Sequence, residues 1–292
     1  MEAIRLAAIL VTLALAPAPP APVAPSGPVA YSGTGAWIDR YDFATLDDPE
    51  LVVADMASHG VRTLYLGTGS WRTPRTIDIE APRPTERLIR AAHARGMKVV
   101  AWYVPDFKHL RLDMRRVGAA VAFRTRDGQA FDSFALDIEA TAVNPLSRRN
   151  AALMRLSRWI RMAVGPHYPL GAIVPDQLST TRAGGLWPGF PYARAAKDYD
   201  VFLAMAYSTL NRAHGPGRVY AYTAANVRFV RHATHRPVHL IAGVTDAMTP
   251  AEQAVATRAA RDAGAIGTSL YKYKLYDTGS WAALSAFDAG RP

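Results

Sequence analysis

The 292-residue sequence contains no cysteine. This absence excludes disulfide frameworks, thiolate metal sites, iron–sulfur clusters and cysteine nucleophiles. Lysine is scarce, with five residues among the 34 basic ones, so the formal charge of +10 comes mainly from arginine. No basic run is interleaved with aromatic residues, and the longest cluster (Arg111, Arg115 and Arg116) is interpreted as a solvated helix face. Because nucleic-acid binding needs a localised basic stripe, we do not expect this protein to bind nucleic acid. The net charge is compatible with anionic cell-wall polymers.

The N-terminal segment has no apolar run long enough to cross a membrane as a helix. Residues 6–16 form an apolar run of 11 residues, whereas a spanning helix needs about 20. The shorter length is typical of a secretory signal, and the proline-rich stretch that follows favours an extended spacer. We therefore expect a signal peptide at 1–16, a linker at 17–32 and a folded domain at 33–292, exported to the bacterial cell surface. An uncleaved anchor is the alternative.

From residue 33 onward, apolar strand patterns alternate with amphipathic helical patterns. The predicted strands are 35–39, 61–67, 97–104, 133–139, 170–175, 200–207, 238–244 and 266–273. The predicted helices are 48–58, 84–95, 147–164, 224–233 and 250–263. Strands that are apolar on both faces belong to buried parallel sheets, and their alternation with helices indicates repeated strand–helix–strand units.

Eight strands in about 260 residues match a (β/α)8 TIM barrel in number and length. We therefore predict an α/β protein with a single barrel domain. We expect it to be a monomer that uses no cofactor and no metal, and that is not stably inserted in a membrane once the signal is cleaved. A doubly wound sheet is the alternative, but residues 39–43 after the first strand lack the glycines of a dinucleotide-binding fingerprint. Residues 121–131 predict a small hairpin ahead of the fourth strand, with its turn at 126–129.

The segment 131–139 carries the most chemical information and reads Phe-Asp-Ser-Phe-Ala-Leu-Asp-Ile-Glu. Side chains alternate along a strand, so Ser133, Ala135, Asp137 and Glu139 share one face. The other face is apolar and suits packing beneath the outer helices. The first face then points to the barrel axis and places two acids at the C-terminal end of the strand, which is the active-site end of a TIM barrel.

Two neighbouring carboxyl groups at such a position repel one another and are partly desolvated. Both effects raise the pKa of at least one of them, which favours a protonated acid beside an ionised partner. Glycosidic cleavage needs this division, since one acid protonates the leaving oxygen while negative charge supports the oxocarbenium-like centre. A strand-end salt bridge is the alternative. A metal site is less favoured, because no strand-end histidine accompanies the pair.

The same segment resembles the fourth-strand signature of chitinase-type family 18 glycoside hydrolases, in which three Asp and a Glu alternate along the strand. The resemblance implies that Glu139 is the general acid and that Asp137 orients the substrate's N-acetyl group, which then acts as internal nucleophile. Asp132 takes the place of the first Asp. Ala135 and Ser133 stand where the family has an Asp and a Gly, and loss of the middle Asp removes a proton-sharing partner.

A second motif supports this resemblance. Residues 200–208 are similar to the family's sixth strand, which ends in Met-x-Tyr-Asp, with Met205 and Tyr207 in place and Ser208 instead of the Asp. The resemblance implies that Tyr207 positions the acetamido group. Where the family often has a Trp on the eighth strand as the floor for sugar stacking, this chain has Tyr271-Lys272-Tyr273.

Residues 135–139 also resemble the Asp-x-Glu of family 25 lysozymes, which begin with a Gly-Ile-Asp strand comparable to residues 35–39. This resemblance implies that Asp39 belongs to the site and that peptidoglycan is the substrate. The two assignments share the barrel, Asp137, Glu139 and an amino-sugar polymer. They differ over Asp39 and Tyr207.

Other candidates lie just past predicted strands or in loops. Asp106, Asp176 and Asp246 follow strands and are each readily explained as turn or cap residues. Asp176 or Asp39 is the candidate for a compensating carboxylate. The strand aromatics that could stack on sugar rings are Trp37, Trp102, Tyr103, Tyr271 and Tyr273. Trp71 and Trp187 lie in loops rich in glycine and proline and are preferred as outer sugar contacts.

The sequence therefore predicts a secreted glycoside hydrolase that cleaves β-linked amino-sugar glycans of chitin or peptidoglycan type. Glu139, Asp137 and Tyr207 form the predicted catalytic set, and the predicted substrate-binding residues are Asp39, Trp102, Tyr103, Asp176, Met205 and Tyr271. Because Ala135 and Ser208 replace motif acids, a carbohydrate-binding barrel without turnover is the alternative. An unrelated lyase or isomerase chemistry is a third possibility, since fold alone does not fix function.

Overall fold

The computed structural model describes residues 28–46, 48–244 and 247–289. The predicted signal peptide, most of the predicted linker and Asp246 lie outside the described residues. No helix in the described ranges combines the length and the apolar character that crossing a membrane requires.

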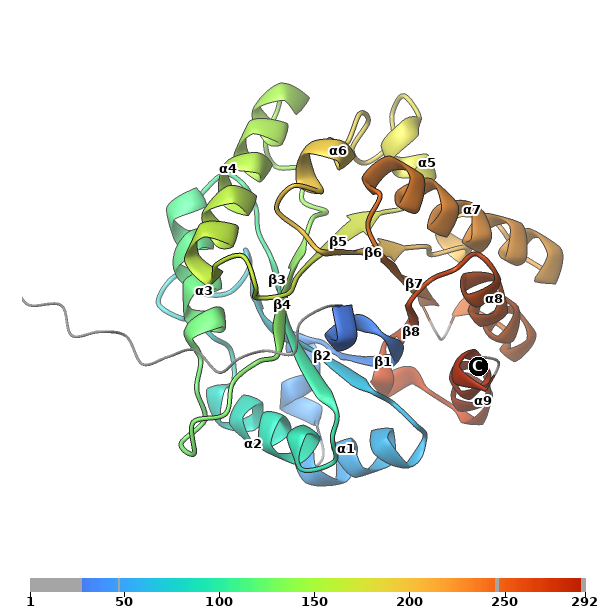
Figure 1. The fold of residues 1–292 in the computed structure, drawn as a ribbon, viewed down its shortest axis with the longest axis horizontal. Coiled ribbons are helices and arrows are strands. Elements are labelled where there is room, and N and C mark those ends of the chain that lie inside the picture. Colours follow the sequence, from blue (N-terminus) through green and yellow to red (C-terminus); the bar gives the residue numbers. More distant parts are fainter. Residues whose placement is uncertain (1–27, 47, 245–246, 290–292) are drawn as a thin grey trace, which may run out of the picture.

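Eight parallel strands pair in chain order and close into a barrel, which confirms the predicted (β/α)8 fold (Figure 1). The strands are β1 (Gly33–Ile38), β2 (Thr63–Ser70), β3 (Lys98–Val104), β4 (Ser133–Asp137), β5 (Leu170–Pro175), β6 (Val201–Met205), β7 (Val238–Val244) and β8 (Gly267–Tyr271). The barrel closes where β8 pairs with β1, in a register that sets Gly33 opposite Gly267 and Ala36 opposite Leu270.

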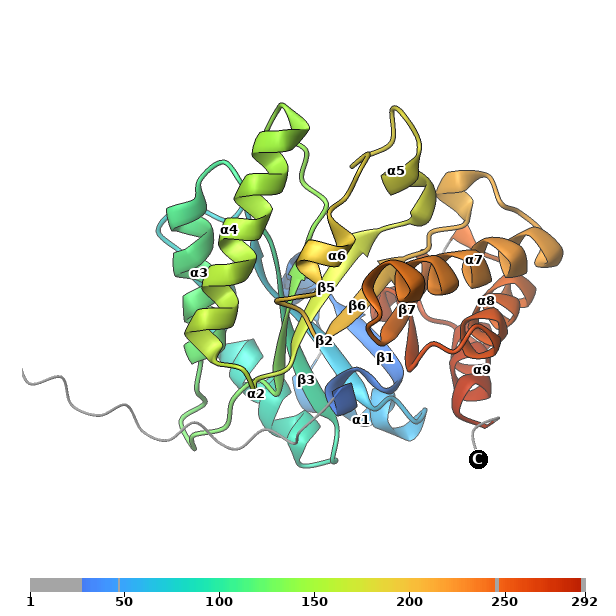
Figure 2. The same ribbon diagram turned by 45° about the horizontal axis from the view of Figure 1, so that its top comes forward.

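The helices form a ring outside the strands (Figure 1). They are α1 (Pro49–Ser58), α2 (Pro82–His93), α3 (Leu110–Ala122), α4 (Leu146–Val164), α5 (Gln177–Thr181), α6 (Tyr192–Ala195), α7 (Pro216–Thr234), α8 (Pro250–Asp262) and α9 (Thr278–Asp288). Short 3-10 helices are η1 (Pro28–Tyr31), η2 (Arg40–Thr45), η3 (Thr209–Asn211) and η5 (Tyr273–Leu275). In the turned view of Figure 2, α5 lies on the side toward which the strands run.

The alternation of side chains along β4 divides them between two apolar clusters. Phe134 and Leu136 point outward and are fully buried in the larger cluster between the strands and the helices. Ala135 points inward and is buried in a smaller cluster inside the barrel, together with Val100 of β3 and Ile173 of β5. This inward orientation of odd-numbered β4 residues is the one that the sequence predicts for Asp137 and Glu139.

Residues 28–32, which the sequence predicts to be linker, lie at the end of the barrel where the strands begin. Tyr31 is fully buried, and its hydroxyl forms a hydrogen bond of 2.5 Å with Ser133 Oγ and donates to the Phe134 carbonyl at 3.0 Å. Thr63 Oγ1 donates to the Ala30 carbonyl at 3.1 Å. Residues 30–31 are therefore part of the barrel floor.

Two expectations about local structure are wrong. Residues 121–131 do not form a hairpin, because Val121 and Ala122 complete the last turn of α3. Only the turn is present, closed by a hydrogen bond from Thr125 N to the Gln129 carbonyl at 2.9 Å. The fourth strand also ends earlier than predicted, at Asp137, so that Glu139 lies in the loop that leaves the strand.

Candidate active site

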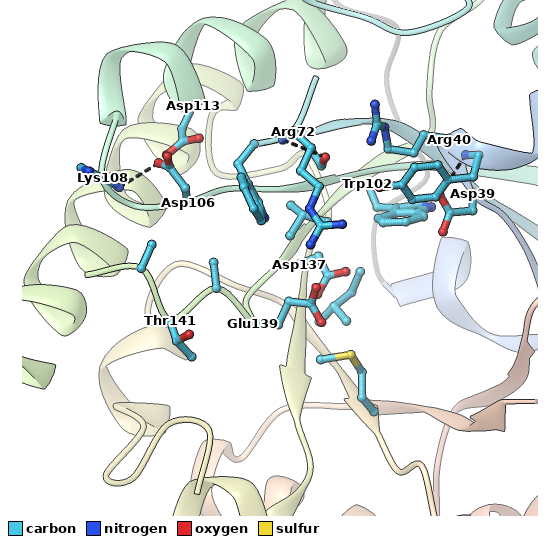
Figure 3. A pocket seen from close by; sticks show the side chains of 18 of the residues that line it. Asp39, Arg40, Arg72, Trp102, Asp106, Lys108, Asp113, Asp137, Glu139 and Thr141 are labelled. Carbon is cyan, nitrogen blue, oxygen red and sulfur yellow. Dashed lines mark hydrogen bonds between the residues drawn. The ribbon is translucent and has the colours of Figure 1, made fainter. Parts of the chain in front are cut away.

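A cavity of about 830 Å³ lies at the C-terminal ends of the strands (Figure 3). Its lining includes acids (Asp39, Asp106, Asp113, Asp137 and Glu139), cations (Arg40, Arg72, Arg75 and Lys108) and aromatic residues (Trp37, Tyr41, Trp71, Trp102, Tyr207 and Tyr271). The volume falls within the range of about 300–1,000 Å³ that is usual for small-molecule sites.

The predicted acid pair lies in this cavity, and Figure 3 shows the two carboxyl groups beside one another. Asp137 is only 8% exposed, and its Oδ1 has no hydrogen-bond partner among the described residues. Burial raises its pKa well above the usual value, and the charges of Glu139 and Asp39 raise it further. Asp137 therefore keeps a proton at a pH at which an exposed aspartate is ionised.

Glu139 is the exposed member of the pair. Partial desolvation raises its pKa, the positive charge of Arg72 opposes this rise, and the charge of Asp39 adds to it. Figure 3 shows the Arg72 guanidinium pointing toward the two carboxyl groups. Glu139 is thus accessible and has a raised pKa. A general acid needs both properties.

Asp39 is a further carboxylate whose charge acts on the pair, and it comes directly after β1. It is 7% exposed and forms the N-terminal cap of η2. Its Oδ1 accepts a hydrogen bond from Tyr41 N at 3.1 Å, and its Oδ2 accepts one from the Tyr271 hydroxyl. These bonds fix the orientation of the carboxylate. The part of the chain that the structure describes contains no group of three His, Asp or Glu that could hold a metal ion.

Tyr207 and Met205 line the same cavity from β6 and the residues that follow it. Burial raises the pKa of Tyr207 well above its usual value, and Asp137, Glu139 and Asp39 raise it further. The hydroxyl therefore stays protonated beside the acids and can donate a hydrogen bond. Ser208, which replaces the acid of the resembled motif, is fully buried and is not part of the cavity wall.

Aromatic rings form the inner part of the cavity. Trp37 stacks on Tyr65 at a centroid distance of 4.2 Å and meets Trp102 edge to face at 5.8 Å. Its indole Nε1 donates to Ser269 Oγ at 2.7 Å. By contrast, the buried Nε1 of Trp102 has no acceptor among the described residues. Trp71 stands at the rim with 46% of its surface exposed, consistent with an outer contact.

Two predicted substrate-binding residues do not line the cavity. Tyr103 points outward from β3, because it is the neighbour of the inward-facing Trp102, and its buried hydroxyl donates to Asp113 Oδ1 at 2.8 Å. Asp176 caps α5 and accepts hydrogen bonds from Leu178 N and Ser179 N. Strand alternation allows only one of the neighbours Trp102 and Tyr103 to face the cavity.

Three further candidates also lie elsewhere. Trp187 is fully buried, packs edge to face on Phe107 at 5.6 Å and donates its indole hydrogen to Asn150 Oδ1 at 2.7 Å. Tyr273 donates its hydroxyl to Asp55 Oδ2 outside the barrel. Asp132 lies at the start of β4, at the end far from the cavity, where Lys98, His93 and Val99 N bind its carboxylate.

The cationic side of the cavity was not predicted from the sequence. Arg72 and Arg75 lie in the loop between β2 and α2, and Lys108 lies between β3 and α3. Arg116 of α3 holds the first of these loops and is buried, in contrast to the predicted solvated face. It donates hydrogen bonds to the carbonyl oxygens of Ser70, Thr73, Pro74 and Ile77, at 2.5 to 3.2 Å.

The state of Asp137 gives a testable dependence of stability on pH. The unfolded chain ionises this residue near its usual pKa of 3.8, whereas the folded protein keeps it protonated to higher pH. The wild type therefore loses stability as the pH rises above that value, by about 1.4 kcal/mol for each pH unit until the folded pKa is reached. Asp137→Asn cannot ionise, so we expect it to have a higher free energy of unfolding than the wild type at pH 7 and no advantage at pH 3, measured by urea denaturation.

Asp106→Asn is the matched control. Burial alone would raise the pKa of Asp106, but hydrogen bonds from the backbone and ring of His109 outweigh it and lower the pKa. Its contribution to stability is present above the unfolded pKa and lost on acidification, so this variant should be destabilised at neutral pH. Equal pH profiles for Asp137→Asn and the wild type would contradict the assignment of a raised pKa to Asp137.

No protein-family model and no curated protein sequence matches the chain. Solved structures share its fold. The endo-β-1,4-mannanase from Thermotoga petrophila superposes with a TM-score of 0.63 at 10% identity, over 89% of this chain and 76% of that one. A GH18 chitinase from Cycas revoluta in complex with allosamidin superposes with a TM-score of 0.62 at 12% identity, over 88% of this chain and 99% of that one. The GH5_18 protein from Streptomyces cattleya in complex with GlcNAc superposes with a TM-score of 0.65 at 12% identity, over 90% of this chain and 82% of that one. The chain thus shares its (β/α)8 barrel fold with these proteins, among them a family 18 chitinase.

Proposed function

We propose that this protein is a glycoside hydrolase that cleaves β-linked amino-sugar glycans, with Glu139 as the general acid. The observation that carries the proposal is the grouping of Asp137, Glu139 and Asp39 in one cavity at the active-site end of the barrel. Aromatic residues lie in the same cavity and offer flat faces on which sugar rings can stack.

The chemistry follows from the different surroundings of the acids. Glu139 reaches solvent and gives its proton to the glycosidic oxygen as the bond from that oxygen to the anomeric carbon breaks. The electron pair of this bond goes to the leaving oxygen, and a water molecule later supplies the hydroxyl group of the product. Negative charge in the group formed by Asp137, Glu139 and Asp39 stabilises the positive charge that develops on the sugar ring.

Unpaired polar atoms support an N-acetyl amino sugar as the group bound next to the acids. Asp137 Oδ1 and Trp102 Nε1 are buried without hydrogen-bond partners among the described residues, and burying such atoms unpaired is costly. An acetamido group offers an N–H donor for the former and a carbonyl acceptor for the latter. The Tyr207 hydroxyl, kept protonated by its surroundings, is a further donor for that carbonyl.

Two routes remain for the nucleophile, and both residues that distinguish them line the cavity. In a family 18-like route, Asp137 and Tyr207 hold the acetamido group while its oxygen attacks the anomeric carbon. In a family 25-like route, Asp39 supplies the carboxylate. The fixed orientation of Asp39 by Tyr41 N and Tyr271 supports a role in either case.

The direct test is detection of new reducing ends when the purified protein is incubated with chitotetraose, peptidoglycan fragments or mannotetraose. Release from the first two and not from the third supports the proposal. Release from mannotetraose alone would place the substrate in a different sugar class.

A carbohydrate-binding barrel without turnover is the second candidate. Ala135 favours it, because this position is buried among apolar side chains inside the barrel and carries no acid that could share a proton with Asp137. Isothermal titration with the same oligosaccharides separates the two candidates. Heat of binding without any product favours the binding barrel.

Trp71 provides a test of sugar stacking at the rim. Because a stacked ring contributes about 0.5–1.5 kcal/mol, Trp71→Ala should raise KM about three- to tenfold. Since Trp71 lies outside the acid cluster, kcat should change little. Steady-state kinetics on the cleaved oligosaccharide measure both values, and a fall in kcat with unchanged KM would argue against a stacking role.

We also propose that the protein is exported. The apolar run at 6–16 and the proline-rich stretch after it support this. Cell fractionation with an antibody against the barrel tests it, and recovery of the protein in the cytosolic fraction alone would contradict it.

A further inference from the structure

One flank of the cavity carries three cationic side chains, of which Arg72 faces Glu139. Arg72, Arg75 and Lys108 all line the cavity, and none of them forms an ion pair with a carboxylate of the described residues. Neighbouring arginines are paired: Arg40 with Glu80 at 2.5 Å and Arg115 with Asp78 at 2.6 Å. Three cations without an ion pair of their own therefore line one and the same cavity.

Two acids, Asp106 and Asp113, lie on the same side of the cavity, and their carboxyl groups accept hydrogen bonds from groups other than the three cationic side chains. The Asp106 carboxylate is bound by the backbone N–H groups of Lys108 and His109 and by the His109 ring at 2.6 Å. Asp113 is buried, and desolvation raises its pKa to about 6. Arg75 contacts no acid here and donates a hydrogen bond of 3.3 Å to His109 Nε2.

The loop that carries Arg72 and Arg75 is anchored through its backbone and adjoins the predicted sugar site. Arg116 and Arg115 of α3 bind the backbone of the loop that carries Arg72 and Arg75. The Arg72 guanidinium lies over the Trp71 ring at 4.8 Å, and it also faces Glu139 (Figure 3). A sugar stacked on Trp71 with its scissile bond at Glu139 would therefore have its substituents next to these positive charges.

We propose that the glycan recognised here is anionic, with a carboxylate or a sulfate or phosphate ester on a sugar next to the cleaved bond, held by Arg72, Arg75 and Lys108. This inference rests on the proposed function, since it assigns a substrate class to the same site. Arginine and lysine at a partly enclosed rim bind such groups by charge-assisted hydrogen bonds.

The test measures binding by isothermal titration to the Glu139→Gln variant, which leaves the ligands intact. The ligands are neutral chitotetraose, a tetrasaccharide of alternating N-acetylglucosamine and N-acetylmuramic acid, the same tetrasaccharide with its carboxylates converted to amides, and 6-O-sulfated chitotetraose. We expect an anionic ligand to bind about tenfold more tightly than its neutral counterpart at low salt, with the preference shrinking at about 0.5 M salt. The muramic acid and sulfated ligands distinguish the two sources of charge.

Charge removal provides the second arm. Arg75→Gln combined with Lys108→Gln should reduce the preference to less than about threefold. Lys197→Gln combined with Arg218→Gln removes the same charge from exposed positions outside the cavity and should preserve it.

Equal affinity of the acid and its amide, together with no gain from sulfation, overturns the anionic proposal. If the wild type nevertheless cleaves chitotetraose, the proposed hydrolase function survives that result. If the protein binds anionic glycans preferentially but the wild type cleaves none of them, the anionic proposal is supported and the proposed hydrolase function is contradicted. Failure of every ligand to bind overturns both.

Discussion

Glu139→Gln is expected to lower kcat for glycan cleavage by about 10²–10⁴-fold while leaving the fold intact. Glutamine has nearly the same shape as glutamate but carries no proton to donate to the leaving oxygen. Because Glu139 is exposed, the substitution leaves no unpaired buried group. Reducing-end kinetics measure the loss, and far-ultraviolet circular dichroism with a thermal melt verifies the fold.

The matched control is Glu50→Gln on α1. Glu50 forms an exposed ion pair with Arg87 and lies outside the cavity, so its loss should leave kcat unchanged and reduce stability by less than about 1 kcal/mol. A folded Glu139→Gln protein that cleaves at the wild-type rate would remove Glu139 from the mechanism. The alkaline limb of the wild-type pH–rate profile should lie above the usual pKa of a glutamate, because desolvation raises that of Glu139.

Arg116→Ala is expected to destabilise the protein by about 3–5 kcal/mol, because it leaves several buried carbonyl oxygens without a donor. The side chain is 1% exposed, and its guanidinium binds four carbonyl groups between residues 70 and 77. These residues form the cavity wall that carries Trp71 and Arg72, so glycan affinity should fall together with stability. Urea denaturation and isothermal titration measure the two losses.

Arg111→Ala is the control on the same helix. Arg111 is exposed, and the substitution should change the free energy of unfolding by no more than about 0.5 kcal/mol. If Arg116→Ala does not fold, Arg116→Lys retains the charge without the planar fork of donors and should show a smaller loss in the same direction. Equal stability of the Arg111 and Arg116 variants would contradict the buried role of Arg116.

The two arginines show where a local pattern loses information. Arg111, Arg115 and Arg116 form one basic cluster in the sequence, and the pattern favours a solvated face. In the structure, Arg116 faces the barrel and meets carbonyl oxygens some 40 residues earlier in the chain. The sequence contains no signal for that contact, because the loop that supplies the oxygens has no periodic pattern of its own.

The sequence by itself determined the barrel and the position of its acids. Apolar strands alternating with helices favour one closed parallel sheet, and the period of two along the fourth strand places Asp137 and Glu139 on the inner side. Asp39, Tyr207 and Tyr271 are candidates that the family resemblances imply. The same period allows only one of the neighbours Trp102 and Tyr103 to face the cavity, and the strand, apolar on both faces, does not indicate which one.

Only the tertiary structure decided which loops form the wall of the cavity and how charge is distributed there. Burial of Trp187 against Phe107 and the gathering of Arg72, Arg75 and Lys108 at one rim depend on contacts between loops distant in the chain. The alternation of side chains along a strand arises from the backbone of each residue, so a short stretch of sequence is enough to show which side chains share a face. The solvation and charge of a side chain depend on every segment packed around it, and these exist only once the barrel has closed.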